Sequence, residues 1–577
     1  PARDSVTNDI HWTLWNVQQY IMDVVYSDTT LASHESLLNG FKFGSASSFP
    51  GPCNPPANPD TTHTVAIRAS YPNTVGWPTQ GDGPGTFARK PTGCYLAPGS
   101  IATVTVPAAL VGRGFKIRVG AHSWDFSNKP TIKRLDRSTV LYAINAVETK
   151  VACPHGGGIY LEVPWLANQG TVNISVRNAV RSPYFSAKSF HQTTPAEWLT
   201  ERTNPGPWAD FQSDKFMMQV PRSWIFAMPD PTQVMKDWDA AMDALNDLLG
   251  FPQIRGKESF YLQVDTLLRT SVFAPGYPAV NVGGYSSTAN YNNGYNTHYL
   301  IRGPQYRTDD AQVEFHEQGH GYFFDKFPGE VESNVNLPFV PVLHRKFGVN
   351  LDTAFRASLG DGNTYRTLET TAMAWMTVFN FSPRKVEMAD AEKAYQLKGH
   401  AKFVDIARIY GWGVLGNYWK SFVTDSENGI NYATDSDSLL LRLSRNVGAD
   451  MRPLFHFWGI YPQNATNLRT AINNAGLVAP VEIHDRLVRY KSLVPANNAA
   501  FRDFASRWWT RQPSADGFWE EREHATQWNN YNENAALGIT DRVQELIDLY
   551  YPNGRPTTIT GPAVQSLSPS DNSTNVA

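Results

Sequence analysis

The strongest constraint on the fold is a change in hydrophobic period partway along the chain. Between residues 62 and 185, short runs with alternating apolar residues are separated by turn residues. From about residue 216, apolar residues recur instead at intervals of three and four, as in residues 229–249. A period of two is typical of half-buried strands, and a period of 3.6 is typical of helices. The sequence therefore predicts a multidomain α+β protein, in which an N-terminal β-sandwich precedes a mainly helical region.

The chain of 577 residues is too long for one hydrophobic core, so several domains are expected. Residues 557–577 are rich in Pro, Ser, Thr and Asn, which favours a linker, and their end resembles the opening of a bacterial immunoglobulin-like repeat. We expect the natural protein to continue into such a domain. The expected boundaries are a helical lead-in at 1–50, the β-sandwich at 51–190, a linker at 191–215, a mainly helical domain at 216–480, a helical C-terminal subdomain at 481–556 and the linker at 557–577.

The charge content and the hydrophobic runs of the chain argue against binding to nucleic acid and against a membrane span. Charged residues make up 18% of the chain and the formal net charge is −3, so no single-sign field is expected to hold a nucleic acid. No apolar run approaches the roughly 18 to 20 residues that a membrane span needs. The chain starts with Pro1 rather than Met, which indicates a processed or trimmed protein and leaves an export signal possible. We expect a monomer. Cys53, Cys94 and Cys153 could form one disulfide or remain three thiols.

The motif that carries chemistry is His316-Glu-Gln-Gly-His320. Two histidines four residues apart leave one face of a helix roughly 5 to 6 Å apart, so both rings can bind one metal ion. By chance, a His-[Asp/Glu]-x-x-His pattern arises in roughly three in a hundred chains of this length and composition. The alternative is an amphipathic helix with two unrelated histidines. The motif favours one catalytic Zn²⁺, with Glu317 as the general base that takes a proton from the attacking water.

A third metal ligand is needed, and two glutamates follow the motif closely. Glu330 has Asn334 four positions later, and Glu332 has Asn336 at the same offset. A polar residue at that offset often supports a ligating histidine, so the pattern fits either glutamate. We predict Glu330 as the ligand and keep Glu332 as the alternative.

These residues carry a resemblance to a known family. The order His-Glu-x-x-His, eight residues, then Gly-Glu-Val-x-x-Asn resembles the enhancin-like, mucin-directed zinc peptidases, family sixty of the metallopeptidases, which are of the gluzincin type. Further segments that resemble this family are 92–99, 119–122, 154–161, 178–185, 275–278 and 451–460, so the likeness covers about residues 62–475.

The resemblance implies a secreted or cell-surface bacterial virulence enzyme, a mucinase or O-glycopeptidase that cuts mucin-type host glycoproteins beside O-glycosylated Ser or Thr. Residues 216–480 would then be the catalytic domain. Such an enzyme must hold sugar, for which aromatic and planar polar groups are suited. The residues expected to bind glycan are Tyr306, Asp361, Asn363 and Arg366; Tyr365 and His344 are candidate catalytic donors to the oxyanion.

Two other functions fit the same residues. One is a broad-specificity gluzincin or an aminopeptidase, although the Gly-x-Met-Glu-Asn signature of the common aminopeptidases is absent from the sequence. The other is a non-catalytic glycan-binding surface module that retains a metal site. Glu317 argues against the second function, because a module without activity has no need of a general base.

Overall fold

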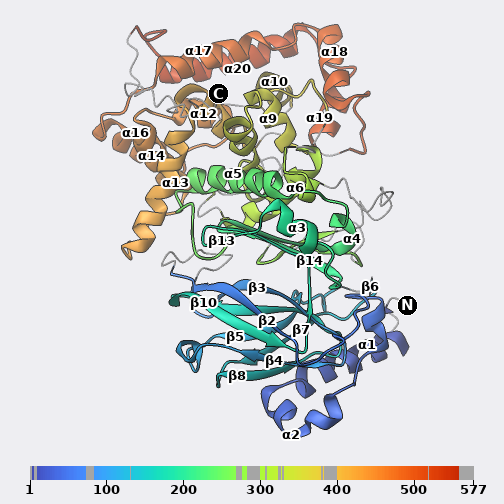
Figure 1. Ribbon diagram of the computed structural model, residues 1–577. Helices are drawn as coiled ribbons and strands as arrows, with labels where there is room; N and C mark the ends of the chain where they lie inside the picture. Colours follow the sequence, from blue (N-terminus) through green and yellow to red (C-terminus); the bar gives the residue numbers. More distant parts are fainter. Residues whose placement is uncertain are drawn as a thin grey trace, which may run out of the picture. The chain divides into compact units, whose positions relative to one another are not determined.

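The computed structural model describes most of the chain and divides it into two compact units (Figure 1). Residues 1–246 and 252–307 belong to the first unit, and residues 247–251 and 308–577 belong to the second. The architecture is mixed α/β. The described residues are 3–4, 10–72, 83–129, 131–267, 276–282, 299–305, 308–322, 326–327, 330–360, 362–378, 381, 399–517 and 519–557.

Two antiparallel sheets share one core in the first unit. The four-stranded sheet has the order β2 (Thr62–Ser70), β10 (Asn168–Arg177), β4 (Ile101–Thr105), β8 (Glu148–Ala152). The five-stranded sheet has the order β11 (Val180–Arg181), β3 (Phe87–Leu96), β9 (Gly157–Pro164), β5 (Lys116–His122), β7 (Ser138–Ala143). Their inward residues, such as Val104 and Ile174 of the first sheet and Ile117 and Leu161 of the second, form one buried cluster. These strands contain the alternating runs recognised in the sequence.

Glycine allows two strands of the five-stranded sheet to approach closely. A Cβ on Gly157 would lie 2.5 Å from the backbone of Gly120 on the neighbouring strand β5. Gly120 has a φ of +86°, which L side chains rarely adopt, and its own Cβ would lie 2.2 Å from the carbonyl oxygen of Ser138. The triple glycine at 156–158 therefore serves backbone packing.

The lead-in is helical, and the cysteines are unpaired. Helix α1 (Ile10–Tyr20) continues into a π-helical turn (Ile21–Val25), and α2 (Asp28–Leu38) follows and contacts β8 (Figure 1). Cys53, Cys94 and Cys153 are all free thiols, which agrees with the second of the two alternatives left open by the sequence.

Residues 191–215, predicted to be a linker, instead form regular structure. They contain β13 (His191–Gln192), helix α3 (Pro195–Glu201) and β14 (Trp208–Ser213). These strands join a six-stranded mixed sheet of order β13, β12 (Tyr184–Lys188), β14, β15 (Phe216–Pro221), β16 (Phe260–Asp265), β17 (Ala279–Val282). The prolines that suggested a connection lie at helix and turn positions: Pro195 begins α3, and Thr194 caps it with Glu197 in a capping box.

The two faces of this sheet differ in chemistry because side chains alternate along each strand. Phe211 of β14 packs against Trp198 of α3, and Phe216 of β15 stacks on Trp238 of α5 (Thr232–Leu249) with ring centroids 4.5 Å apart. On the opposite face, Asp210 accepts a hydrogen bond from Tyr160 of the β-sandwich. Helices therefore cover one face, and the β-sandwich packs on the other.

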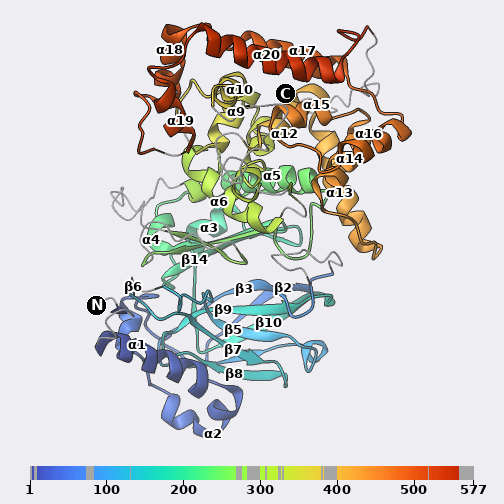
Figure 2. The ribbon, with the colours of Figure 1, turned by 180° about the vertical axis from the view of Figure 1, so that it is seen from behind.

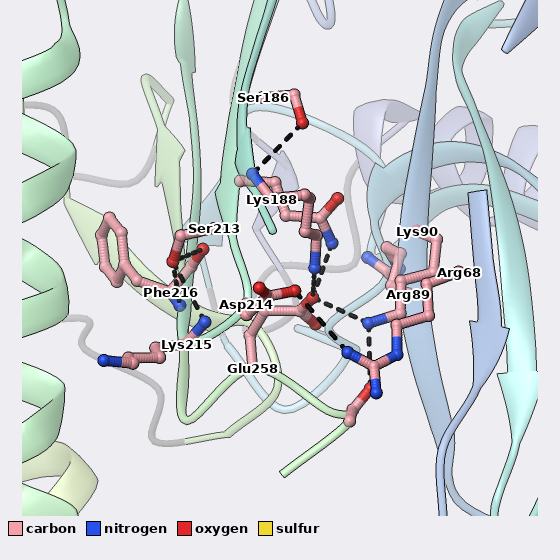
Figure 3. A network of polar contacts seen from close by, with 12 residues as sticks. Arg68, Arg89, Lys90, Ser186, Lys188, Ser213, Asp214, Lys215, Phe216 and Glu258 are labelled. Carbon is pink, nitrogen blue, oxygen red and sulfur yellow. Dashed lines mark hydrogen bonds and ion pairs between the residues drawn. The ribbon is translucent and has the colours of Figure 1, made fainter. Parts of the chain in front are cut away.

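A buried ionic cluster joins the β-sandwich to this sheet (Figure 3). Glu258, which is fully buried, accepts hydrogen bonds at Oε1 from Lys90 of β3 and Lys188 of β12, each at 2.7 Å, and from Gln212 of β14 at 2.6 Å. Tyr277 donates to its Oε2 at 2.8 Å. Although burial opposes ionisation, the two ammonium groups hold the pKa of Glu258 at about 2. Because this pKa lies below its ordinary value, the cluster stabilises the fold above about pH 4.5 and loses that contribution as the pH falls towards 2.

The second unit is built from helices. Helix α6 (Thr308–Tyr322) carries the histidine motif. Two helices near the C-terminal end, α17 (Val481–Ser492) and α20 (Glu533–Tyr550), pack side by side (Figures 1 and 2). No helix in the described part of the chain is both long enough and apolar enough to span a bilayer. The helices that follow α6 are α7 (Val331–Asn334), α8 (Phe339–Pro341), α9 (Leu351–Ser358), α10 (Leu368–Met376), α12 (Ala401–Tyr410), α13 (Trp412–Glu427), α14 (Ser436–Val447), α15 (Arg452–Phe457), α16 (Ala465–Asn474), α17 (Val481–Ser492), α18 (Asn498–Trp509), α19 (Trp519–Gln527) and α20 (Glu533–Tyr550).

Replacing Glu258 by Gln should destabilise the protein by about 3 to 5 kcal/mol, because two buried ammonium groups lose their counter-charge. Chemical denaturation monitored by tryptophan fluorescence measures the loss. Glu148→Gln, at an exposed position of β8, is the matched control and should stay within about 0.5 kcal/mol of the wild type. Equal stability of the two variants would contradict the role assigned to the cluster.

Candidate metal centre

Helix α6 presents both motif histidines on one side. The ring centroids of His316 and His320 are 5.0 Å apart, as expected for side chains one helical turn apart. Phe315, which directly precedes His316, is buried and stacks on Phe339 of α8 with ring centroids 4.9 Å apart. The apolar side of the helix is thus anchored, and this fixes the direction of the two imidazoles.

Glu332 of α7 completes a three-residue group. Its Oε2 lies 3.3 Å from Nε2 of His316 and 3.6 Å from Nε2 of His320. Within the described residues, these three side chains form the group whose donor atoms, all within 4.8 Å of one another, could hold a metal ion. Two imidazole nitrogens and one carboxylate form a donor set that zinc prefers at catalytic sites. The residues therefore fit the ion that the motif implies.

Glu330, the ligand preferred from the sequence, has a different partner. Its carboxylate is completely buried and forms an ion pair with Lys402 of α12, and the backbone N–H of Phe327 donates to it at 3.2 Å. A buried carboxylate that neutralises a buried lysine is not directed at the histidines. The structure therefore places Glu332, the alternative, beside the two histidines, and the identity of the third metal ligand stays a prediction.

Asn336 supports the metal-binding geometry from two directions. Its Oδ1 lies 2.9 Å from Nδ1 of His316, and its Nδ2 donates to the backbone carbonyl of Glu332 at 3.1 Å. The Nε2 group of Gln312 also donates to Asn336 Oδ1. Because an amide oxygen only accepts, Nδ1 of His316 must carry the proton, which leaves the Nε2 lone pair available to a metal. Asn336 thus orients the His316 ring and fixes the segment that carries Glu332.

Gly319, inside the motif, allows α6 and α7 to meet. A Cβ at this position would lie 2.5 Å from the backbone oxygen of Val335, a contact that a side chain cannot make. The His-Glu-x-x-His pattern does not specify the residue at this position. Its glycine is the signal, in the sequence itself, that another backbone segment passes close to the histidine helix.

Burial shifts the pKa values of three ionisable side chains in or near the site. Burial raises the pKa of Glu317 above its ordinary value, and the carboxylate of Glu332 adds to the rise while His316 opposes it. Burial lowers the pKa of His320, with a further lowering from His316. Burial also lowers the pKa of Lys326. Burial therefore favours the neutral form of the His320 imidazole, the form that binds a metal.

The other candidate residues make contacts away from the histidines. His344 is bonded through Nδ1 to the carbonyl of Val349 at 2.9 Å. Asn363 donates to the carbonyl of Trp508 at 2.9 Å, and the guanidinium of Arg366 lies over the Trp508 ring at 4.9 Å. The guanidinium carbon of Arg507 lies over the Tyr365 ring, 3.9 Å from the centroid of that ring.

Three of these side chains thus hold the end of α18, and their proposed catalytic or glycan-binding roles stay predictions. Tyr306 and Asp361 lie outside the described residues. Sequence reasoning missed Gln312, although it precedes His316 by one helical turn on the same helix. It also missed Lys402, which no local pattern connects to the motif.

Comparison with known families agrees with this site. The profile of the N-terminal domain of M60-like peptidases matches residues 64–177, and that of peptidase M60, enhancin and enhancin-like, matches residues 178–459. The two matches adjoin and span both the β-sandwich and the histidine motif. The chain belongs to the enhancin-like M60 metallopeptidases.

Curated relatives match a shorter stretch. A TRPM8 channel-associated factor homolog from Danio rerio is 29% identical over 195 residues, which is 33% of this chain and 21% of the relative. Human TRPM8 channel-associated factor 2 is 30% identical over 162 residues, which is 28% of this chain and 17% of the relative. The chain thus matches about a fifth of the length of these proteins.

Solved structures share the fold at low sequence identity. A conserved Bacillus anthracis protein of unknown function has a TM-score of 0.52 and 17% identity, covering 72% of this chain and 79% of that chain. IMPa metallopeptidase of Pseudomonas aeruginosa, in complex with T-antigen, has a TM-score of 0.50 and 16% identity, covering 76% and 53%. A metallopeptidase in complex with Tn antigen has a TM-score of 0.50 and 12% identity, covering 71% and 76%.

Replacing Glu332 by Ala should remove the bound metal, because one of three donors is lost. Glu330→Ala is the matched variant two residues away; it should keep the metal but lower the stability, since Lys402 is left buried without its carboxylate. Metal content by elemental analysis and thermal unfolding of both variants measure the two effects. Loss of metal from Glu330→Ala together with full occupancy of Glu332→Ala would return the ligand role to Glu330.

Proposed function

We propose that this protein is a secreted or cell-surface zinc endopeptidase that cleaves O-glycosylated proteins of the mucin type. The observation that carries the proposal is the group of His316, His320 and Glu332, whose donor atoms all lie within 4.8 Å of one another. Membership of the M60 metallopeptidases supports a metalloprotease. The T-antigen and Tn antigen bound by structural neighbours support a substrate that carries O-linked sugar. Such a substrate implies that the enzyme works outside the cell that makes it.

The three donors would hold the ion, and Glu317 would move the proton. When bound at such a site, Zn²⁺ lowers the pKa of water to about 7 and polarises the scissile carbonyl. Glu317 lies next to His316 in the sequence and at the same site. Its carboxylate would accept a proton from the attacking water and donate it to the leaving amine. The partial burial that raises its pKa makes Glu317 a stronger base for this transfer.

Asn336 and Gln312 act through His316. The hydrogen bond from His316 Nδ1 to Asn336 keeps the imidazole in the tautomer that leaves Nε2 available, and Gln312 fixes the amide. Asn336 also holds the backbone of Glu332, so the two helices that supply donors share one positioning residue.

Replacing Glu317 by Gln should lower kcat/KM for an O-glycopeptide roughly 10²- to 10⁴-fold, because the amide cannot accept the proton of water. The three metal donors are unchanged, so zinc content should remain at the wild-type level. Mass spectrometry of the digest and elemental analysis give the two readings. Glu533→Gln, on the exposed first turn of α20, is the control and should cleave normally. Near-full turnover by the Glu317 variant would remove this residue from the mechanism.

A glycopeptide and the same peptide without sugar should differ in cleavage by at least about 10²-fold, since a site built to hydrogen-bond a substrate group rejects an analogue that lacks it. Competition of the two peptides in one digest, read by mass spectrometry, measures the ratio. Equal cleavage would favour a broad-specificity gluzincin. Cleavage of neither peptide by zinc-loaded protein would favour a non-catalytic glycan-binding module.

A further inference from the structure

A second site candidate lies in the first unit, whereas the metal-binding residues belong to the second. A cavity of about 920 Å³ opens between the π-helical turn that follows α1, strands β3, β5, β7 and β9, and the segment at residues 276–277. Cavities that bind small organic ligands have volumes of roughly 300 to 1,000 Å³. The space is therefore large enough for one or two sugar residues and too large for an inorganic anion alone.

The buried end of the cavity carries an excess of positive charge. Arg89 of β3 and Arg118 of β5 both donate to the same oxygen, Oε1 of Glu162 on β9. The side chains of Arg89 and Glu162 are each 3% exposed, and that of Arg118 is 12% exposed. A guanidinium stays protonated in proteins, so two positive charges share one negative charge in a poorly hydrated place. A bound anion would compensate the second guanidinium.

Arg118 has the donors to hold that anion. Its Nε donates to Glu162, and its Nη1 donates to Thr139 at 2.9 Å. These contacts use two of the five N–H groups that a guanidinium offers. Arg89 is engaged more fully, because it also donates to the carbonyl of Ala121 at 2.8 Å and to Ser123 at 3.1 Å. Arg118 is thus the better anchor for a carboxylate, which a guanidinium can bind through two parallel hydrogen bonds.

An aromatic wall is held in place beside these charges. Nε1 of Trp124 donates to the carbonyl of Pro278 at 2.6 Å, and Gly276 leaves room for the ring, since a Cβ there would lie 2.5 Å from Trp124. Tyr277 lines the same cavity, and its hydroxyl is bonded to Glu258. Rings fixed by hydrogen bonds offer a flat apolar face without a large entropy cost on binding, and the C–H face of a sugar packs well on such a surface.

The outer end of the cavity is acidic. Asp23 and Asp28 line it, and Arg137 lies between the carboxylates of Asp23 and Asp125. Carboxylates accept hydrogen bonds from hydroxyl groups but repel a second negative charge. The lining, which also includes Lys257, therefore suits a ligand with an anionic group at the buried end and hydroxyl groups at the outer end.

We propose that this cavity binds a glycan residue that carries one carboxylate, such as a terminal sialic acid, with Arg118 as the anchor for that carboxylate. The acidic outer residues would bind the sugar hydroxyls, and Trp124 would pack against the ring. This binding site would let the protein hold acidic glycans independently of peptide cleavage. The proposal does not depend on the metal centre, because binding is measured without turnover.

The test is isothermal titration of the whole chain with 3′-sialyllactose, with lactose and with a singly sulfated lactose. We expect sialyllactose to bind and lactose to bind at least about tenfold more weakly, since lactose lacks the charged group. Sulfated lactose distinguishes the two sources of charge: weaker binding than sialyllactose supports a carboxylate site, and tighter binding would overturn that assignment. Binding of neither acidic sugar at millimolar concentration would overturn the proposal as a whole.

Variants assign the binding to Arg118. Arg118→Gln should weaken sialyllactose binding roughly 10- to 100-fold, the effect of losing a charge-assisted contact, and Arg118→Lys should restore part of it. The thermal midpoint of Arg118→Gln should be unchanged or higher, because Arg89 and Glu162 then form a balanced pair. Arg177→Gln, at an exposed position of the same β-sandwich, is the matched control and should bind like the wild type. Equal binding by Arg118→Gln would overturn the assignment.

Discussion

The carboxylate of Glu258 is the contact on which the first unit depends. It accepts hydrogen bonds from a lysine of the β-sandwich and from a lysine and a glutamine of the six-stranded sheet, so it bridges the two layers in a place from which water is excluded. A buried ion pair adds little stability compared with apolar packing of the same volume, but leaving one partner alone is costly. The cluster therefore disfavours any arrangement of the two layers that separates Lys90 or Lys188 from the carboxylate.

A similar constraint decides which glutamate faces the motif histidines. Glu330 and Glu332 are two residues apart at the start of a short helix, yet the first is fully buried and the side chain of the second is 48% exposed. Lys402, about seventy residues later, takes the carboxylate of Glu330. The structural ion pair fixes the segment, and Glu332 is then directed towards His316 and His320. The Glu332 side chain stays partly exposed to solvent, because Glu330 and not Glu332 pairs with the buried Lys402.

Features that depend on a local sequence pattern were predicted correctly. Features that depend on a contact with a residue far away in the sequence were not. Alternation located the strands of the β-sandwich, and the four-residue spacing of His316 and His320 located their common face. The offset rule for a supporting asparagine fitted two glutamates equally well, and only the position of Lys402 separates them. Residues 191–215 were predicted to be a linker because their strands are short and Pro195 interrupts the pattern at the start of α3. Their strand β14 is defined by its pairing with β12 and β15, which a local pattern does not show. Likewise, the contacts of Arg366 and Asn363 with α18 join residues more than 140 positions apart, so no local pattern predicts them. Their glycan-binding roles stay predictions.

Two clusters in the first unit place two cations on one carboxylate, and their chemistry separates their roles. Around Glu258 the cations are lysines, and burial, with a contribution from Lys188, lowers the pKa of Lys90 to about 8. That cluster can release a proton in mildly alkaline solution and so relieve its own excess charge. Around Glu162 the cations are arginines, which do not release a proton under ordinary conditions. Their excess charge persists at every physiological pH, and it lies at the wall of a cavity. Because its cations are arginines, the cluster around Glu162 is suited to bind an external anion. The cluster around Glu258 needs no such anion, because its lysines can lose their excess charge.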